Sequence, residues 1–399
     1  MDKNSIDNIL KINKNNKLNF MIIDGFYEDP MAVREFALSQ KIDIKEHIPG
    51  HRTPSFSNDT LRNNIQDILK PYGNINNIHI SLNTLIADEH EINSGAFFIN
   101  TSKSEIPWIH TDGKKYSAII YLTPNAPIIS GTSILTPTKD VVIVDKRSFD
   151  KTKWHEIDIV CNKFNRMLIF DSSQYHLPNN YFGINNEDGR LTQVLWFNIE
   201  PMQPIKYSNI IKSVYPCNLN PLNNCEIIVI DNIYEDPISV RNFALKQQFY
   251  ISGNFPGKRT KPFLSNELIR KLDSCLCNYD IDMTNIRNET HNCGSFQLFN
   301  CSNKSWVHKY TDIEWCGIIF LNPDAPVISG ITLYEYYDNN ATYETMNIYS
   351  YDMTKWIEFD TIGNVFNRLI LFNAKRWHML KNNFGLTIEN CNLCQVFFI

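Results

Sequence analysis

Two short segments of the chain carry the polar side chains that a mononuclear non-haem iron site needs. Residues 108–121 read WIHTDGKKYSAIIY and residues 170–192 read FDSSQYHLPNNYFGINNEDGRLT. In this order they supply His110, Asp112, His176 and Arg190. Two imidazoles and one carboxylate bind one face of an Fe(II) ion and leave its other positions open for a co-substrate and dioxygen. The order and spacing of these residues therefore predict a metal centre.

Predicted strands explain how these side chains can converge. Residues i and i+2 of a strand point to the same face, so His110 and Asp112 can reach one ion without distorting the chain. His176 follows an apolar strand at 166–171 and would approach from the opposite side. Arg190 begins the next strand, where its guanidinium can hold a carboxylate in a bidentate pair. We expect the first three residues to bind metal and Arg190 to bind an anion.

Each of these residues also has a purely structural interpretation. An HxD pair occurs often by chance, and a single histidine is more often a hydrogen-bonded core residue than a ligand. Tyr121 alone is typical of a half-buried aromatic residue in a sheet. Arg190 alone could pair with Glu187 or Asp188 at the surface. Four features in the expected order favour the metal site over these alternatives.

The chain contains an internal repeat, which decides its architecture. Four segments of the first half recur in the same order in the second half, and the first two of them recur at a constant offset of 207 residues. The four pairs are IDGFYEDPMAVREFALSQ (23–40) and IDNIYEDPISVRNFALKQ (230–247), PGHRT (49–53) and PGKRT (256–260), YLTPNAPIISG (121–131) and FLNPDAPVISG (320–330), and FNRMLIFDSSQYH (164–176) and FNRLILFNAKRWH (366–378). The repeat predicts a polar N-terminal arm at 1–17, a domain at 18–203, a Pro- and Asn-rich linker at 204–223 and a second domain at 224–399.

Each copy is predicted to begin with helices and to continue with short strands. After an apolar strand from Phe20 to Ile23, Asp29 caps a helix that has Pro30 at its first position. A second helix is expected to start at Asn58 and to end before Pro71 and Gly73. It presents one apolar face, formed by Leu61, Ile65, Ile68 and Leu69.

The rest of the copy is rich in β-branched and aromatic residues, which favour strands. Strands are expected at 78–86, 95–100, 116–122, 132–136, 166–171 and 191–198. The predicted fold class is α+β, with two tandem double-stranded β-helix (jelly-roll) domains, each with N-terminal helices packed on one sheet.

The second copy keeps both histidines, as His308 and His378, but has lost most of the other polar groups. Tyr310 stands two residues after His308, and Asp312 follows a one-residue insertion. Tyr121, Arg190 and Thr192 correspond to Phe320, Asn392 and Cys394. We expect this copy to be a non-catalytic pseudoenzyme domain.

Other metal sites in the second copy are left open as alternatives. A bulge could bring Asp312 toward the histidines. Zinc could bind at Cys391 and Cys394, but residues three apart in a strand face opposite sides, which makes chelation poor. The pairs Cys275 with Cys277 and His291 with Cys293 are similarly weak candidates.

At His110, Asp112, His176 and Arg190 the chain resembles the 2-oxoglutarate- and Fe(II)-dependent oxygenases, a jelly-roll superfamily with an HxD...H triad and a downstream Arg or Lys for the far carboxylate of 2-oxoglutarate. Tyr121 in IIYLTP resembles a tyrosine of the prolyl-hydroxylase-like members that shares this carboxylate. Arg190-Leu191-Thr192 resembles an RxS/T pair with the same role. Residues 18–203 are also similar to small bacterial members that carry PGxR, HTDG, FNR and GRLTQV segments, a group that indicates no substrate.

The resemblance implies a hydroxylase with Fe(II), 2-oxoglutarate and O2, which releases succinate and CO2. His110, Asp112 and His176 would bind the metal, and Arg190, Tyr121 and Thr192 would bind 2-oxoglutarate. The prolyl-hydroxylase-like branch implies a protein side chain or an amino-acid-like substrate. The PGxRT segments precede the barrel, which favours a role in folding over one in specificity.

Two other functions are weighed against this one. The chain could be a non-enzymatic binding or structural module built from two drifted jelly rolls. It could also be a nucleic-acid demethylase of the same superfamily, but a net charge of −5 and a pI near 6.1 argue against a nucleic-acid partner.

The composition is that of a globular protein, with 43% hydrophobic and 20% charged residues among 399. No run of residues approaches the length of a membrane span, and the N-terminus has no apolar signal segment. Nine of the ten cysteines lie at or after Cys217, so the halves share no disulfide framework and free thiols are expected. These features predict a cytoplasmic protein; they leave the oligomeric state undetermined.

Overall fold

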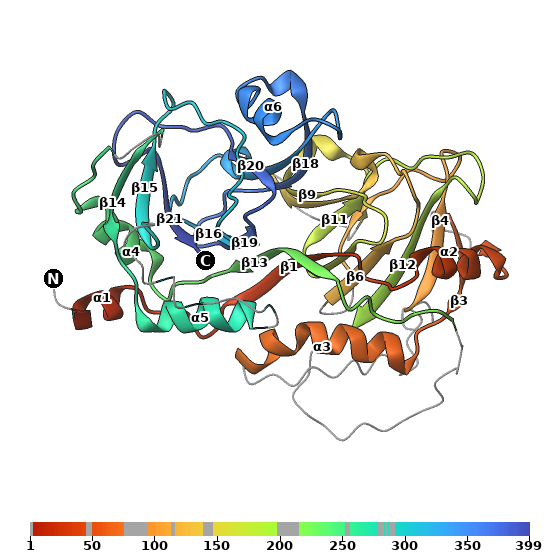
Figure 1. The fold of residues 1–399 in the computed structure, drawn as a ribbon. Helices are drawn as coiled ribbons and strands as arrows, with labels where there is room; N and C mark the ends of the chain where they lie inside the picture. Colours follow the sequence, from red (N-terminus) through yellow and green to blue (C-terminus); the bar gives the residue numbers. More distant parts are fainter. Residues whose placement is uncertain are drawn as a thin grey trace. The chain divides into compact units, whose positions relative to one another are not determined.

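The computed structural model describes residues 3–44, 50–75, 94–112, 116–138, 147–197, 215–251, 256–277, 279, 283, 286 and 292–399 (Figure 1). The chain divides into two compact units. The first unit is Phe20–Glu226, and the second unit consists of Met1–Asn19 together with Ile227–Ile399. Within the described residues, no helix is both long and apolar enough to cross a bilayer.

The first unit opens with the predicted strand and two helices. Strand β1 (Lys17–Asp24) leads to α2 (Pro30–Ser39), whose first turn is capped by Asp29 through a bond from the Ala32 amide. Helix α3 (Asp59–Ile75) starts after Asn58, which accepts the Leu61 amide at 2.9 Å. These starts follow from ordinary capping chemistry.

The predicted end of the second helix is wrong. Helix α3 continues through Pro71 and Gly73 to Ile75 instead of stopping before Pro71. A proline removes one backbone donor and disturbs the preceding turn, but its own dihedral angles are helical. One lost hydrogen bond is therefore not enough to end this helix.

The strands of the first unit form two antiparallel sheets. The major sheet has the order β1-β10-β6-β12-β4-β3-β2 and the minor sheet the order β9-β7-β11-β5-β8. Their bounds are β2 Asp43–Ile44, β3 His51–Ser55, β4 Ala96–Asn100, β5 Ile109–His110, β6 Tyr116–Tyr121, β7 Thr132–Pro137, β8 Arg147–Ser148, β9 Trp154–Val160, β10 Met167–Asp171, β11 Tyr175–Pro178 and β12 Arg190–Phe197.

From β4 to β12 the chain passes repeatedly between the two sheets, as in a jelly roll. The observed strands overlap those expected at 95–100, 116–122, 132–136, 166–171 and 191–198. The strand expected at 78–86 lies outside the described residues. Residues directly opposite each other in β6 and β12 share a face, so Ser117 with Trp196 and Tyr121 with Thr192 point into the space between the sheets.

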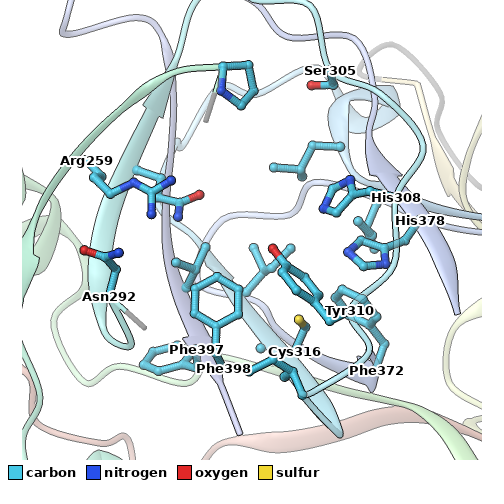
Figure 2. Close-up of a pocket in the computed structure, with 18 of the residues that line it drawn as sticks. Arg259, Asn292, Ser305, His308, Tyr310, Cys316, Phe372, His378, Phe397 and Phe398 are labelled. Atoms are coloured by element: carbon cyan, nitrogen blue, oxygen red, sulfur yellow. The ribbon is translucent and has the colours of Figure 1, made fainter. Parts of the chain in front are cut away.

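The second unit repeats this arrangement. Its sheets have the orders β14-β15-β21-β16-β19-β13 and β20-β17-β18. The elements are α1 Lys3–Ile9, β13 Asn224–Asp231, α4 Pro237–Leu245, β14 Lys258–Pro262, α5 Asn266–Leu276, β15 Ser295–Phe299, β16 Trp315–Phe320, β17 Ile331–Tyr336, α6 Tyr343–Ile348, β18 Trp356–Ile362, β19 Leu369–Asn373, β20 Trp377–Leu380 and β21 Asn392–Phe398. This unit contains a partly open cavity of about 530 Å3 (Figure 2).

A buried ion pair ties the first strand of each unit to a repeated arginine. The Arg166 Nε atom donates to Asp24 at 2.6 Å, and the Arg368 Nε atom donates to Asp231 at 2.7 Å. Burial alone would raise the pKa of Asp24, but Arg166 and Lys163 outweigh it and hold that pKa well below its usual value. The FNR segments of the repeat therefore have a structural role.

The segment before β1 completes the second unit. Ile12 forms a β-bridge with Tyr234, the Asn13 amide donates to the Ile233 carbonyl at 2.8 Å, and the Glu235 amide donates to the Lys11 carbonyl at 3.0 Å. The residues that sequence analysis assigned to a polar arm are therefore, where described, an ordered part of this unit.

The segment before β13 completes the first unit in the same way. Leu219 bridges with Tyr27, the Asn220 amide donates to the Phe26 carbonyl at 2.9 Å, and the Glu28 amide donates to the Asn218 carbonyl at 2.9 Å. These positions match those of the N-terminal segment in the repeat. Of the predicted linker at 204–223, the described residues 215–223 thus belong to a folded unit.

We expect Leu10→Ala to destabilise the second unit by about 2–4 kcal/mol, because Leu10 is fully buried and its carbonyl accepts the Ser265 hydroxyl at 3.0 Å. Hydrogen exchange of the β13 and β19 amides measures the effect. The exposed residue Lys14 provides the control, Lys14→Ala, which should change nothing. Equal exchange rates in the two variants would show that the N-terminal segment does not support this unit.

Candidate metal centre

The two predicted histidine ligands of the first unit lie opposite each other on paired strands. His110 in β5 is the register partner of His176 in β11. Their neighbours Ile109 and Leu177 point to the other face, where they pack in a buried cluster with Trp154. This alternation turns both imidazoles toward the space between the sheets.

Backbone carbonyls fix the orientation of both imidazoles. The His110 Nδ1 atom lies 3.0 Å from the Trp108 carbonyl, and the His176 Nδ1 atom lies 3.0 Å from the Gln174 carbonyl. A carbonyl oxygen only accepts, so each Nδ1 carries the proton and each Nε2 presents a lone pair. This tautomer is the one that binds a metal through Nε2.

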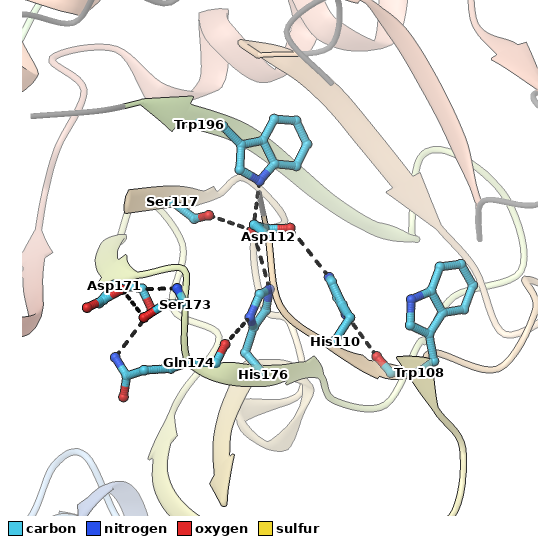
Figure 3. A network of polar contacts seen from close by, with 9 residues as sticks. All are labelled: Trp108, His110, Asp112, Ser117, Asp171, Ser173, Gln174, His176 and Trp196. Carbon is cyan, nitrogen blue, oxygen red and sulfur yellow. Dashed lines mark hydrogen bonds and ion pairs between the residues drawn. The ribbon is translucent and has the colours of Figure 1, made fainter. Parts of the chain in front are cut away.

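A turn before β11 sets the position of His176. The Asp171 side chain accepts the Ser173 amide at 3.0 Å and the Ser173 hydroxyl at 2.7 Å. The Gln174 amide donates to the Asp171 carbonyl at 3.1 Å, which closes the turn. Figure 3 shows this turn beside the imidazole that it supports.

Asp112 is held by one backbone bond and two side-chain donors (Figure 3). Its amide donates to the Ser172 carbonyl at 2.9 Å. Its Oδ2 atom accepts the Ser117 hydroxyl at 2.6 Å and the Trp196 indole N–H at 2.8 Å. These donors orient the carboxylate in the manner of outer-shell partners in metal sites.

The three side chains converge on one point. Asp112 Oδ1 lies 3.8 Å from His110 Nε2, and Asp112 Oδ2 lies 3.5 Å from His176 Nε2. Their candidate ligand atoms all lie within 4.8 Å of one another, and no other such group of three occurs in the described part of the chain. Metal–ligand bonds of about 2.0–2.2 Å are compatible with these separations.

The ionisation of Asp112 also suits a metal ligand. Burial would raise the pKa of this carboxyl, but His176, His110 and the hydrogen bonds from Ser117 and Trp196 outweigh burial, so the pKa lies below its usual value. A carboxylate between two imidazoles fits Fe(II) or a similar divalent ion.

The predicted anion anchors form a second cluster. The Arg190 Nε atom donates to the Ser130 carbonyl at 2.9 Å, and its guanidinium carbon lies 5.5 Å from the centre of the Tyr121 ring. The Tyr121 hydroxyl lies 2.7 Å from the Thr132 hydroxyl, and Thr192 is the register partner of Tyr121. Arg190 is only 4% exposed, so it is not a surface ion-pair partner of Glu187 or Asp188.

Sequence analysis missed several side chains of this interior. Asn100 is the register partner of Arg190, and its buried Nδ2 atom has no hydrogen-bond partner among the described residues. Arg52, from the PGHRT segment, is 5% exposed and lies opposite Phe98, whose ring contacts Trp196. Strand alternation places Trp196 on the same face as Arg190, a signal that the sequence already contained.

The second unit keeps the paired histidines but has no carboxylate between them. The His308 amide donates to the His378 carbonyl at 3.0 Å, and the reverse bond measures 2.8 Å. The Tyr310 amide donates to the Ala374 carbonyl at 2.9 Å, the bond that Asp112 makes in the first unit. Tyr310 therefore occupies the place of the metal-binding carboxylate.

The alternative metal sites of the second unit are not formed by its described residues. Asp312 is exposed and belongs to no cluster of metal-binding side chains within the described ranges. The described cysteines of the candidate pairs, Cys275, Cys277, Cys293, Cys391 and Cys394, join no such cluster either. His291 lies outside the described residues.

No protein-family model and no curated protein matches the sequence. Similar solved structures include a prolyl hydroxylase from Trichoplax adhaerens, in complex with a hypoxia inducible factor peptide fragment, at 14% identity over 44% of this chain and 83% of that chain, with a TM-score of 0.27. A Pseudomonas putida prolyl-4-hydroxylase is 14% identical over 45% of this chain and 92% of that chain, with a TM-score of 0.25.

A variant of the Bacillus subtilis oxalate decarboxylase is 9% identical over 90% of this chain and 75% of that chain, with a TM-score of 0.17. Because all three TM-scores are low, we infer fold and function from the strand order and side chains of the chain itself.

We expect Ser117→Ala and Trp196→Phe each to weaken Fe(II) binding to the first unit by about 10–100-fold, because each removes one donor to Asp112. Anaerobic titration with Fe(II) measures the affinity. His155→Ala, which removes an exposed histidine from β9, should leave it unchanged. Unaltered binding in both donor variants would contradict this role for Ser117 and Trp196.

The second unit should lose stability on acidification. Burial lowers the pKa of His308, although the bond to Trp306 partly opposes it, and burial together with His308 lowers the pKa of His378. Below about pH 6.5 the unfolded chain binds protons that the folded unit does not, so stability falls as pH falls, by at most about 1.4 kcal/mol per pH unit for each histidine.

Urea unfolding of the second unit at pH 7.5 and pH 5 tests this expectation, with amide exchange in β19 as the probe. A variant carrying His308→Gln and His378→Gln should show a smaller pH dependence than the wild-type protein. The same pH dependence in both proteins would mean that these histidines do not stay neutral in the folded unit.

Proposed function

We propose that the first unit is an Fe(II)- and 2-oxoglutarate-dependent dioxygenase that hydroxylates a C–H bond of a protein side chain or an amino-acid-like substrate. The observation that carries the proposal is the convergence of His110, Asp112 and the buried His176, whose candidate ligand atoms lie within 4.8 Å of one another, with Arg190 and Tyr121 on the same interior. The second unit is proposed to be non-catalytic, since Tyr310 takes the place of the carboxylate.

The two clusters are separated by a distance that suits a small dicarboxylic acid. Ser117, which contacts Asp112, and Tyr121, which faces Arg190, lie on the same face of β6. The four residue steps from Ser117 to Tyr121 span about 13 Å between the two Cα atoms. The side chains at each end reach inward from that span, so a keto acid end can lie at the metal while the far carboxylate lies at Arg190.

The far end of the interior has the donors that a carboxylate needs. The Arg190 Nε and Nη2 atoms donate to the Ser130 and Gly131 carbonyls, which fixes the guanidinium and leaves Nη1 for a ligand. The buried Asn100 Nδ2 atom adds a second donor beside it. Burial raises the pKa of Tyr121, although Arg190 and Thr132 oppose it, so its hydroxyl keeps a proton to donate.

The second unit has none of the three donor side chains at the positions of Arg190, Asn100 and Tyr121. The register pair of Asn100 with Arg190 is replaced by Phe299 with Asn392, and Tyr121 is replaced by Phe320. An interior that no longer binds a dicarboxylic acid does not need these donors. The joint loss supports their assignment to 2-oxoglutarate.

When bound, iron and 2-oxoglutarate supply the oxidising power from O2, with release of succinate and CO2. The side chains of this unit orient the reactants and keep water out. His110, Asp112 and His176 would hold the ion, and the ring of Phe170 packs against the His176 imidazole with 4.7 Å between the ring centres. Three protein ligands of this kind would leave other positions of the ion available to a co-substrate and dioxygen.

Purified protein supplied with Fe(II), 2-oxoglutarate and O2 should form succinate even without its substrate. His176→Ala should reduce succinate to the level of the metal-free protein, and Arg190→Ala should do so at low 2-oxoglutarate because the far carboxylate loses its charged partner. The matched control is His378→Ala in the second unit, which should retain full activity.

Absence of succinate together with absence of Fe(II) binding under anaerobic conditions would overturn the proposal and favour a non-enzymatic binding module. If succinate forms, mass spectrometry of candidate proteins and amino acids for the gain of one oxygen atom identifies the substrate.

A further inference from the structure

The cavity of the second unit lies between its paired histidines and β14. Its volume of about 530 Å3 is within the range of small-molecule sites. Most of its wall is apolar, and the residues that form this part include Phe299, Trp306, Ile318, Phe372, Leu380 and Phe398. Such a wall can cover an aromatic or aliphatic body.

The base of the cavity has lost the carboxylate of the first unit and both of its side-chain donors. Tyr310 replaces Asp112, Cys316 replaces Ser117 at the matching strand position, and Phe398 replaces Trp196. The Tyr310 ring packs 5.4 Å from that of Phe398 and 5.7 Å from that of His378. The change removes one negative charge and both of its donors, so the base is neutral and largely apolar.

Among the described lining residues, one permanently charged cation faces this base. Figure 2 shows Arg259 of β14 on one side of the cavity and His308 and His378 on the opposite side. Among the described lining residues the other charged side chain is Asp312, which is exposed. A guanidinium remains charged in proteins, and its planar fork matches a carboxylate.

The chemistry of Arg259 favours an anionic occupant. Its side chain is half-buried against an apolar wall, and burial lowers its pKa while Tyr310 and Tyr250 oppose that change. One cation suits a monoanion better than a phosphate, which carries up to two charges.

We propose that this cavity binds, without a metal ion, a small monocarboxylic acid whose carboxylate pairs with Arg259 and whose aromatic or aliphatic body lies over the paired histidines and Tyr310. The PGKRT segment then contributes to binding as well as to folding, contrary to the role favoured by its place before the barrel. The site is separate from the metal centre and does not depend on the proposed oxygenase activity.

Isothermal titration of the full chain with 3-phenylpropanoate, benzoate and octanoate, in the presence of a metal chelator, tests the proposal. At least one acid should bind at a single site, and 3-phenylpropan-1-ol, which lacks the charge, should bind about 10–100-fold more weakly than 3-phenylpropanoate. Addition of Fe(II) in place of the chelator should leave the affinity unchanged.

Arg259→Gln should weaken acid binding by about 10–100-fold. The matched control is Arg270→Gln, which removes an exposed arginine of α5 and should have no effect. Cys316→Leu provides a second variant, because it fills the cavity without touching the arginine and should also reduce binding. Thermal unfolding of each variant shows whether the unit remains folded.

Binding by none of the three acids would overturn the proposal. So would binding that requires Fe(II), or binding that Arg259→Gln and Cys316→Leu leave intact in folded protein. Loss of binding in Arg190→Gln, with no loss in Arg259→Gln, would place the acid in the first unit and overturn it as well.

Discussion

The pairing of His110 with His176 across β5 and β11 is the constraint on which the metal centre depends. It brings two residues that are 66 positions apart in sequence into register and turns both imidazoles to the same face. A slip of one residue would move both to the other face, where Ile109 and Leu177 now pack. The apolar alternation that buries this cluster therefore also orients the two imidazoles. Asp112 needs only a short continuation of the chain, held by its backbone bond to Ser172, to complete the set.

The second unit shows that this frame persists without the chemistry. His308 and His378 pair as their counterparts do, because the pairing consists of backbone hydrogen bonds that any side chain permits. The side chains that differ are those that point inward. Tyr310 is at the position of Asp112, and Asn392 is at the position of Arg190. Once a metal-binding carboxylate is lost, its donors lose their acceptor, and an apolar replacement of both partners costs little. The result is an interior that keeps the strand pairing of the first unit and has different inward-pointing side chains.

Local patterns in the sequence predicted the parts of the fold that depend on local interactions. Asp29 and Asn58 cap helices where the sequence placed them, and most expected strands appear within a residue or two of their predicted bounds. What could not be predicted depends on distant contacts: Asn100 becomes a neighbour of Arg190 only through the register of β4 with β12. The PGHRT and PGKRT arginines looked structural because nothing in their sequence shows which interior they face. The continuation of α3 past Pro71 shows the limit of a local rule, since one missing donor does not decide where a helix stops.

The placement of residues 10–16 has a consequence for biosynthesis. Leu10 and Ser265 are 255 positions apart, and Asn16 and Lys271 are bonded over the same separation. A nascent chain would expose the buried side chains of Leu10 and Ile12 throughout translation of the first unit and much of the second. The free-energy cost of closing a loop grows only slowly with its length, so this separation costs little stability. Contacts between residues so far apart in sequence nevertheless slow folding. The second unit would therefore complete its folding late, and a protease that removed the leading segment before that time would leave α5 without its partner.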